Sequence, residues 1–204
     1  MKYRITTALI LLSAVMSASN IRISGADSEF RINGDMTIEN TSVKLVGTSE
    51  YLRIEAEGKG ITGEEGLPEL PVHTQLIALP ATGNLKVQSF TYDFEITELS
   101  QKIVPCGWED NIEPDNEFYS RNQWYPGDIV TIAKPSIMRG NRFTQVAMNV
   151  VQYNPVLNKI RTLKDIDLQL EVDYSKTENP LLRTDQKTSE SISKLIESQI
   201  YGSS

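Results

Sequence analysis

The chain is poor in the residues that metal sites and nucleophilic sites need. Its 204 residues include one cysteine, Cys106, and one histidine, His73. One cysteine cannot close a disulfide within the chain, and one Cys with one His cannot make a structural zinc site. A Cys–His nucleophilic pair would need these two residues together. His73 lies in a strand-like run and Cys106 in a turn-like run, and their spacing does not bring them together. We therefore expect a strand histidine, an incidental thiol and no catalytic residue.

Signals for cofactors and other metals are also missing. The sequence contains no P-loop and no G-x-G-x-x-G segment. Two acidic clusters stand out, Glu64-Glu65 and the carboxylates between Asp110 and Glu117. The second could attract calcium, but it lacks the spacing and the glycine of an EF-hand loop, so we interpret it as a solvated loop. We predict no metal site and no cofactor.

No apolar run reaches the ~20 residues that a membrane-spanning helix needs. The first residues instead have the three parts of a secretory signal peptide. Lys2 and Arg4 give a positive start, residues 5–16 are mostly apolar, and Ser17-Ala18-Ser19 supplies small residues for cleavage. No cysteine follows directly, which argues against a lipoprotein. We expect residues 1–19 to direct export to the periplasm, cell surface or exterior of a bacterium.

Positive charge is scarce. Lys and Arg number 20 against 27 Asp and Glu, and removal of Lys2 and Arg4 changes the formal net charge from −7 to −9. An acidic chain repels phosphate backbones, so we expect no nucleic-acid partner. The exported part has the size of one domain and can bury ~70% of its unfolded surface without disulfides.

Short runs of alternating polarity dominate the chain from residue 20 to residue 174. Such runs, with turn residues between them, predict an all-β fold, an antiparallel β-sandwich of jelly-roll-like type. In Ile166–Val172 the apolar residues Leu168, Leu170 and Val172 alternate with polar ones, as in a strand with one buried face. The other predicted strands are Ile21–Ile23, Met36–Ile38, Ser42–Val46, Tyr51–Ala56, His73–Leu79, Leu85–Ile96, Ile129–Ile132, Arg142–Tyr153 and Lys159–Leu163.

The last part, residues 175–204, changes character. Ser175–Lys187 is polar and predicts a linker or exposed loop. The spacing of Ile192, Leu195, Ile196 and Ile200 predicts a short helix over Ser189–Tyr201 with one apolar stripe. Such a helix is marginal alone, so we expect it to dock on the sandwich or on a partner.

Four aromatic residues, Trp108, Tyr119, Trp124 and Tyr125, lie close together in the sequence. Aromatic faces stack on sugars, and they also anchor cores and protein interfaces. A carbohydrate-binding or adhesion module of the cell envelope is therefore an alternative function.

Four motifs occur in order between Gly66 and Val172. The first has Gly66, Pro68, Leu70 and Pro71 in the pattern G-x-P-x-L-P. The second has Tyr119 and then Trp124, Tyr125, Pro126, Gly127 and Asp128. The last two are Pro135-x-x-Met138-Arg139 and a strand ending in Gln152, Tyr153, Asn154 and Pro155, with Lys159-Ile160-Arg161 after it. In this order the motifs resemble the N-terminal prodomain of gingipain-type cysteine peptidases.

Each motif also has a physical interpretation independent of the family. Gly66 and the two prolines after it favour a rigid, extended start to a strand. Pro126-Gly127 fits the centre of a type II turn, in which Gly takes a positive φ. Pro155 ends a β-ladder because it has no N–H. All three are scaffold features rather than catalytic ones.

The resemblance implies a β-sandwich that assists folding of a cysteine peptidase domain and blocks its active-site cleft, in cis or in trans. It also implies that a loop ahead of Trp124 places a basic side chain in the specificity pocket. In this chain the loop should lie within 101–118, where Lys102 is the only basic residue. Cys106, Gly107 and Trp108 are alternative elements of the loop tip, and Arg121 lies just beyond it.

Three functional hypotheses therefore stand: an inhibitory and folding-assisting propeptide, a carbohydrate-binding or adhesion module, and an enzyme using Cys106. The first is favoured because four motifs agree with it. Two forms of a propeptide also stay open, an excised piece of a longer precursor and a free-standing protein.

Overall fold

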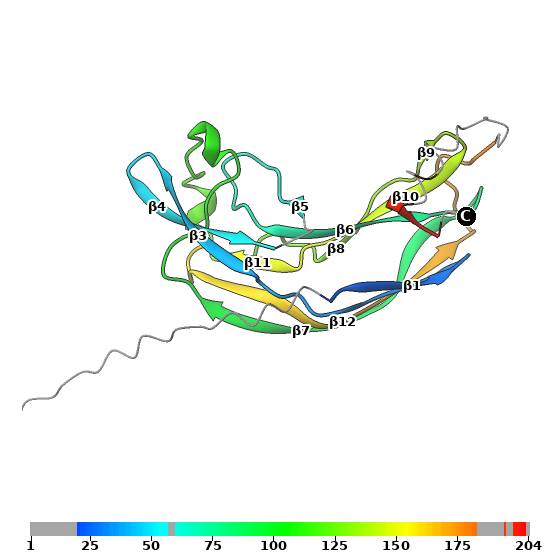
Figure 1. Cartoon of the computed structure of the whole chain (residues 1–204), viewed down its shortest axis with the longest axis horizontal. Helices are drawn as coiled ribbons and strands as arrows, with labels where there is room; N and C mark the ends of the chain where they lie inside the picture. Colours follow the sequence, from blue (N-terminus) through cyan, green and yellow to red (C-terminus); the bar gives the residue numbers. More distant parts are fainter. Residues whose placement is uncertain (1–19, 57–59, 183–193, 195–197, 203–204) are drawn as a thin grey trace, which may run out of the picture.

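Two β-sheets face one another and enclose the hydrophobic core (Figure 1). The computed structural model describes residues 20–56, 60–182, 194 and 198–202. Its sheets are antiparallel except at one short C-terminal strand, which confirms the predicted all-β fold. The predicted signal peptide lies outside the described residues.

The first sheet is built around one long strand. Its members are β1 (Arg22–Ala26), β2 (Glu29–Gly34), β7 (Asn84–Glu98), β11 (Val151–Asn154) and β12 (Lys159–Asp173). One edge of β12 pairs with β11 and β2, and its other edge pairs with β7. The core-facing side chains of β12, such as Leu168 and Leu170, are buried as the alternation predicts.

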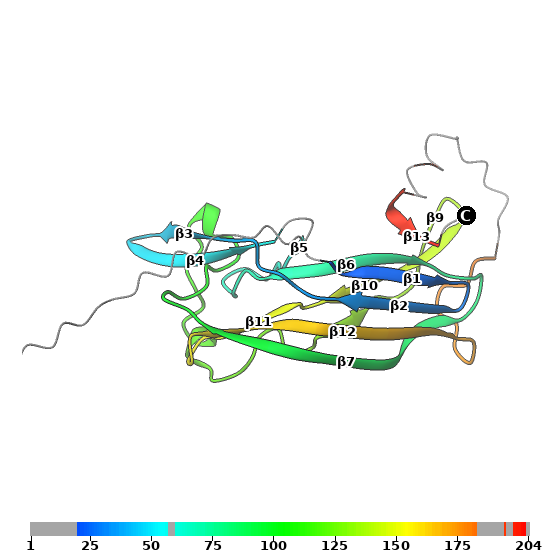
Figure 2. The same ribbon diagram turned by 60° about the horizontal axis from the view of Figure 1, so that its bottom comes forward.

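The second sheet covers the first (Figure 2). Its members are β5 (Gly60–Ile61), β6 (Pro71–Ala78), β8 (Val130–Ile132), β9 (Ser136–Met138), β10 (Asn141–Met148) and β13 (Ile200–Tyr201). Strands β6 and β10 pair at its centre, β8 and β9 lie on the other edge of β10, and β13 runs parallel to β6. A separate hairpin of β3 (Asn40–Val46) and β4 (Ser49–Glu55) extends from one end.

Two strand predictions need correction here, and one neighbouring strand was missed. Met36–Ile38 is not a strand; it connects β2 to β3, and the Met36 amide donates to the Leu163 carbonyl at 3.1 Å. The preceding strand β2 was not predicted. The run 142–153 is two strands, because the chain leaves the second sheet after Met148 and joins the first at Val151.

The opposite error concerns β12, a single strand that the sequence pattern predicts as two, Lys159–Leu163 and Ile166–Val172. A register shift between Lys164 and Asp167 keeps the ladder with β7 continuous, and Asp165 there has a φ of 48°. Such a bulge changes which residues point inward without ending the strand.

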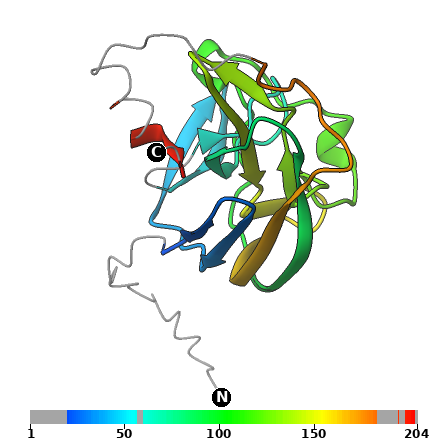
Figure 3. The same cartoon turned by 90° about the vertical axis from the view of Figure 1, so that its right-hand side faces the viewer.

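The described start of the C-terminal part, residues 175–182, is a mostly exposed loop, which is one of its two predicted forms, and hydrogen bonds attach it to the sandwich. Leu181 donates its amide to the Ala81 carbonyl at 2.9 Å, and the buried Arg142 donates to the carbonyls of Glu178 and Asn179. Of the predicted helix, Lys194, Ser198 and Gln199 are helical, whereas Ile200 and Tyr201 form β13. The rest of the predicted helix lies outside the described residues. Figure 3, an end view, shows β13 beside the sandwich.

Candidate functional site

The most irregular part of the described chain is residues 107–123, which we call the presentation loop. It lies at the same end of the molecule as the β3–β4 hairpin (Figure 1). It contains two short 3-10 helices, η1 (Trp108–Asp110) and η2 (Phe118–Ser120). Its conformation is set by the segments below it and at its two ends.

The floor of the loop is a run of extended backbone, residues 102–106, held between two neighbours. On one side Leu52 of β4 bridges to Ile103, with its amide donating to the Lys102 carbonyl at 2.8 Å. On the other side Glu69 donates to the Val104 carbonyl at 2.9 Å, and Cys106 donates to the Leu67 carbonyl at 2.7 Å. The first family motif therefore lies directly beside the floor.

Gly66 joins this floor to the far side of the loop. Its amide donates to the Cys106 carbonyl at 3.1 Å, and its carbonyl accepts from the Asp115 amide at 3.0 Å. Its φ is +78°, a conformation that favours glycine over other residues. A glycine is thus needed here by the backbone angle.

Cys106 belongs to this floor and not to the tip of the loop, residues 109–113. The prediction that Cys106 is an element of the loop tip is therefore corrected. Its side chain is 4% exposed, and its Sγ donates to the Thr62 carbonyl at 2.9 Å. Burial raises the pKa of the thiol, so the reactive thiolate is disfavoured. His73 lies on β6, where it pairs with Met148 of β10.

Trp108 fastens the first end of the loop to the β3–β4 hairpin. Its ring lies 5.3 Å from Lys44 Nζ and 5.7 Å from Arg53 Cζ. Arg53 is itself fixed, because its Nε donates to Glu69 Oε1 at 2.6 Å and Glu69 is 4% exposed. Gly107, just before Trp108, has a φ of 82°.

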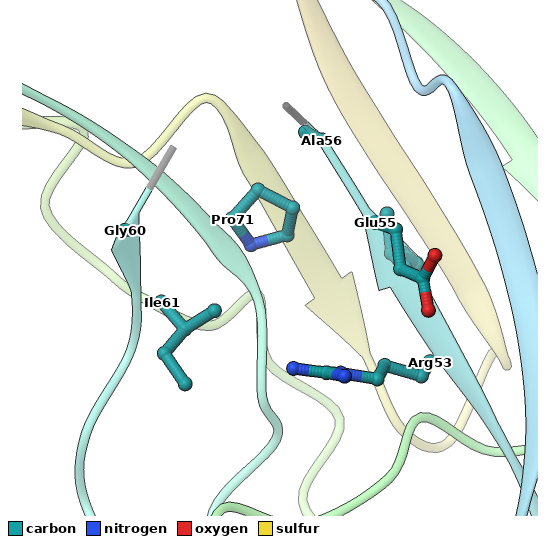
Figure 4. Close-up of a pocket in the computed structure, with 7 residues that line it drawn as sticks. Arg53, Glu55, Ala56, Gly60, Ile61 and Pro71 are labelled. Carbon is teal, nitrogen blue, oxygen red and sulfur yellow. The ribbon is translucent and has the colours of Figure 1, made fainter. Parts of the chain in front are cut away.

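A pocket of about 150 Å³ opens beside Arg53, between β4, β5 and the start of β6. Figure 4 shows the guanidinium of Arg53 reaching across it toward Ile61 and Pro71. Binding sites for small molecules usually enclose about 300–1,000 Å³. We therefore assign no ligand to it.

Phe118 and Tyr119 anchor the middle of the loop in the core. Both are buried, and Tyr119 Oη donates to the Ile103 carbonyl at 2.9 Å. Burial raises the pKa of Tyr119, so its hydroxyl remains a donor. Lys102 Nζ lies 6.0 Å from the Tyr119 ring, which makes Lys102 a neighbour of this anchor rather than of the tip.

The C-terminal end of the loop is held by residues of the second and fourth motifs, which meet at Arg161. Its guanidinium lies 4.7 Å from the Trp124 ring and 4.2 Å from the Phe94 ring. Its Nε donates to Gln152 Oε1 at 2.7 Å, and Gln152 Nε2 donates to the Pro126 carbonyl. Trp124, Gln152 and Arg161, from three separate segments, thus form one contact network.

Two further contacts fix the same end. Tyr125 and Tyr153 exchange backbone hydrogen bonds of 2.9 and 2.7 Å, and Asn154 Nδ2 donates to Asn122 Oδ1 at 2.9 Å. β11 ends at Asn154, as predicted from Pro155. The predicted type II turn is wrong: Tyr125–Pro126 is cis, and Gly127 is not among the glycines with positive φ. The contacts of Tyr125 and Pro126 with β11 determine the path of the chain here.

The exposed side chains of the loop are mainly charged or amide residues. Arg121 pairs with Glu117 and lies 5.8 Å from the Phe118 ring. Its backbone is extended, with φ −85° and ψ 131°. Asn122 and Gln123 follow it and are exposed, as are Glu109 and Asp110 of η1. Arg121 is therefore the basic residue that the loop itself exposes.

The described part of the chain contains no group of three or more His, Cys, Asp or Glu residues able to hold a metal ion. In that part, no helix is long and apolar enough to cross a membrane.

Comparison with known proteins identifies the family. The model of the Propeptide_C25 family matches residues 30–203. The chain belongs to this family. The predicted resemblance to gingipain-type propeptides is confirmed, and with it the conclusion that the chain is a non-catalytic propeptide rather than a peptidase domain.

Similar curated proteins come from Porphyromonas gingivalis. Lys-gingipain is 27% identical over 157 residues, which cover 71% of this chain and 9% of that protein. Gingipain R2 is 29% identical over 164 residues, which cover 76% of this chain and 21% of that protein. The matched region thus spans about a tenth to a fifth of the length of these relatives.

Two solved structures share the fold. A complex of the RgpB pro- and mature domains of P. gingivalis gives a TM-score of 0.75 at 18% identity, covering 90% of this chain and 98% of that one. A structure on the zymogenic latency of gingipain K, from the same species, gives a TM-score of 0.65 at 21% identity. The match covers 79% of this chain and 96% of that one.

Sequence reasoning identified most of the motif residues at this site but not their partners. Lys44, Arg53 and Phe94 have no distinguishing pattern, because each is one residue of an ordinary alternating strand. Arg161 follows the fourth motif in the sequence, yet only the pairing of β11 with β12 places it opposite Gln152.

Proposed function

We propose that this propeptide inhibits a gingipain-like cysteine peptidase, and assists its folding, by presenting residues 107–123 to the active-site cleft. One observation supports this most. Gly66, Trp124, Gln152 and Arg161, all from the family motifs, make their contacts at the two ends of one exposed loop. A loop held in one conformation loses less entropy on binding, which favours tight association.

Arg121 is the basic residue that we assign to the specificity pocket. It is exposed on extended backbone, the form in which substrate-like peptides lie along a protein surface. Lys102 fits this role less well, because its backbone is held against β4. Insertion of Arg121 would require its exposed pair with Glu117 to open, and such pairs are weak.

Folding assistance follows from the same rigidity. A surface that is already formed can stabilise the complementary surface of a partner and so favour the partner's native state. We also propose that residues 1–19 direct the chain to the periplasm or the exterior of a bacterium, where such peptidases would act.

We do not propose sugar binding for this chain. Trp108 contacts Lys44 and Arg53, and Trp124 contacts Arg161, so both rings already serve contacts within the chain.

The test is a titration of the full chain against gingipain-type peptidases, with Lys-gingipain and gingipain R2 as probes. We expect inhibition of at least one peptidase with a Kd near nanomolar, equivalent to about −12 kcal/mol. Arg121→Ala should weaken inhibition at least tenfold, whereas Lys134→Ala, at an exposed lysine between β8 and β9, should not.

Two results would count against the proposal. Absence of both inhibition and faster refolding of the peptidases would reject the function. Weakening by Lys102→Ala, with no effect of Arg121→Ala, would reject the assignment of the basic residue.

A further inference from the structure

The presentation loop separates two halves of the chain that are joined by strand pairing. The first half is residues 20–106 and the second is residues 124–202. β7 of the first half pairs with β12 of the second from Asn84↔Asp173 to Glu98↔Lys159. Within the described residues β7 has no other strand partner. The longest ladder of the fold therefore joins one half to the other.

The other central ladders also connect the halves. β2 pairs with β12, β6 pairs with β10, and β13 pairs with β6. Outside the ladders, Leu79 donates its amide to the Arg142 carbonyl at 2.8 Å, and Leu99 donates to the Asn158 carbonyl at 3.0 Å. Separation of the halves would break all these hydrogen bonds and leave the buried backbone groups among them without partners, which is costly.

The hydrophobic core is shared in the same way. Phe30, Leu70 and Ile77 belong to the first half, and Met148 and Leu168 belong to the second. All five are buried in one cluster. Neither half can keep its own part of the core from water alone, so association is favoured by the apolar area that both bury.

The tip of the loop, residues 109–113, by contrast, makes only local backbone hydrogen bonds among the described residues. Asp110 donates to the Gly107 carbonyl at 2.9 Å, and Asn111 donates to the Trp108 carbonyl at 3.0 Å. On either side of the tip the chain is held independently, by Trp108 against the β3–β4 hairpin and by the Asp115 amide on the Gly66 carbonyl.

We infer that the presentation loop can be cut without releasing either half of the propeptide. Hydrolysis adds one water across one peptide bond and leaves a carboxylate and an amine. No ladder between the halves passes through residues 109–113, so a cut there breaks none of them. If the proposed function holds, a peptidase that cuts this loop still faces an assembled propeptide, whose two pieces separate only when the sandwich opens.

The test uses the full chain with a tobacco etch virus protease recognition sequence inserted between Asn111 and Ile112. After complete cleavage we expect the two pieces to co-elute in size-exclusion chromatography at the volume of the uncut protein. They should separate in 6 M guanidinium chloride. The melting temperature of the cut protein should rise with its concentration, because folding is then bimolecular, whereas that of the uncut protein should not.

Separate elution of the pieces at micromolar concentration, or loss of the near-ultraviolet circular dichroism on cleavage, would overturn the inference. A second variant, with the same insertion between Asn122 and Gln123, serves if the first does not fold. This test needs no peptidase, so its result is independent of the inhibition assay. In that assay the protein cut at Asn111 should inhibit within about tenfold of the uncut form.

Discussion

At the scale of single residues, Arg161 has the most consequential contacts. It stacks between Phe94 and Trp124 and donates to Gln152, which is fully buried. A guanidinium is suited to this position because it is planar and carries several fixed donors. Lysine has neither property, so Arg161→Lys is not a conservative change here.

Replacement of Arg161 by Ala should lower the free energy of unfolding by about 2–3 kcal/mol, since it removes both stacking contacts and leaves a buried amide oxygen without its donor. Urea unfolding followed by tryptophan fluorescence measures this. Arg31→Ala is the matched control, because Arg31 is 55% exposed and pairs with Asp167 at the surface. Equal, small effects of the two variants would contradict the role given to Arg161.

Three buried side chains, Cys106, Tyr119 and Tyr153, and the half-buried Tyr125 make the free energy of unfolding depend on pH in the alkaline range. Burial raises the pKa of Cys106 and of Tyr119, and raises those of Tyr125 and Tyr153 to about 12. In the unfolded chain these groups ionise at about 8.5 and 10. The unfolded state therefore loses protons first, and stability should fall as the pH rises from about 9 to 12.

This prediction is checked by urea midpoints measured between pH 7 and 11, with tyrosine ionisation followed at 295 nm. We expect the midpoint to be constant below pH 8 and to decrease above pH 9. A midpoint that stays constant to pH 11 would show that these side chains are accessible to solvent in the folded state.

At the scale of elements, alternation predicts strands well where one face is buried and poorly where the chain changes sheet. Leu168, Leu170 and Val172 locate β12 because their neighbours are polar. The run from Arg142 to Tyr153 does not reveal that it contains two strands. Apolar residues, Met148, Val150 and Val151, are buried all along the passage from one sheet to the other. That division depends on the sheet each strand joins, which is tertiary information.

The need for tertiary information also limits what the sequence can predict about the candidate site. The motifs at Gly66, Trp124 and Gln152 can be found in the sequence, but their convergence cannot. Gly66 meets Cys106 and Asp115 through backbone groups, which every residue carries. The type II turn at Pro126-Gly127 is wrong for a related reason: local preference gives way to the contacts with β11.

The segment 177–181 is hydrogen-bonded to the sandwich. Arg142 of β10 is 2% exposed and donates to the carbonyls of Pro80, Glu178 and Asn179. Arg142→Leu should free this segment while β10 keeps its pairing with β6. Hydrogen exchange of the Leu181 amide should then accelerate at least tenfold, while that of the Val146 amide, within β10, should change little. Unchanged exchange at Leu181 would mean that Arg142 does not hold the segment.

At the scale of the whole molecule, the charged groups are distributed unevenly. The first sheet carries paired charges, with Lys86 on Glu171 at 3.0 Å, Lys164 on Glu95 at 3.1 Å and Lys159 on Glu98 at 2.8 Å. Glu109, Asp110 and Glu113 of the presentation loop have no ion-pair partner among the described residues. Under the proposed function, the partner contacts the loop end, where these carboxylates lie, rather than this sheet.

Hydrogen exchange of the chain, alone and with an inhibited gingipain-type peptidase in excess, tests this most directly. We expect slower exchange in residues 107–123 and at the tip of the β3–β4 hairpin, with little change in β9 and the turn after it, residues 136–140. Protection confined to β9, or to the outer edge of β7, with none in 107–123, would contradict it.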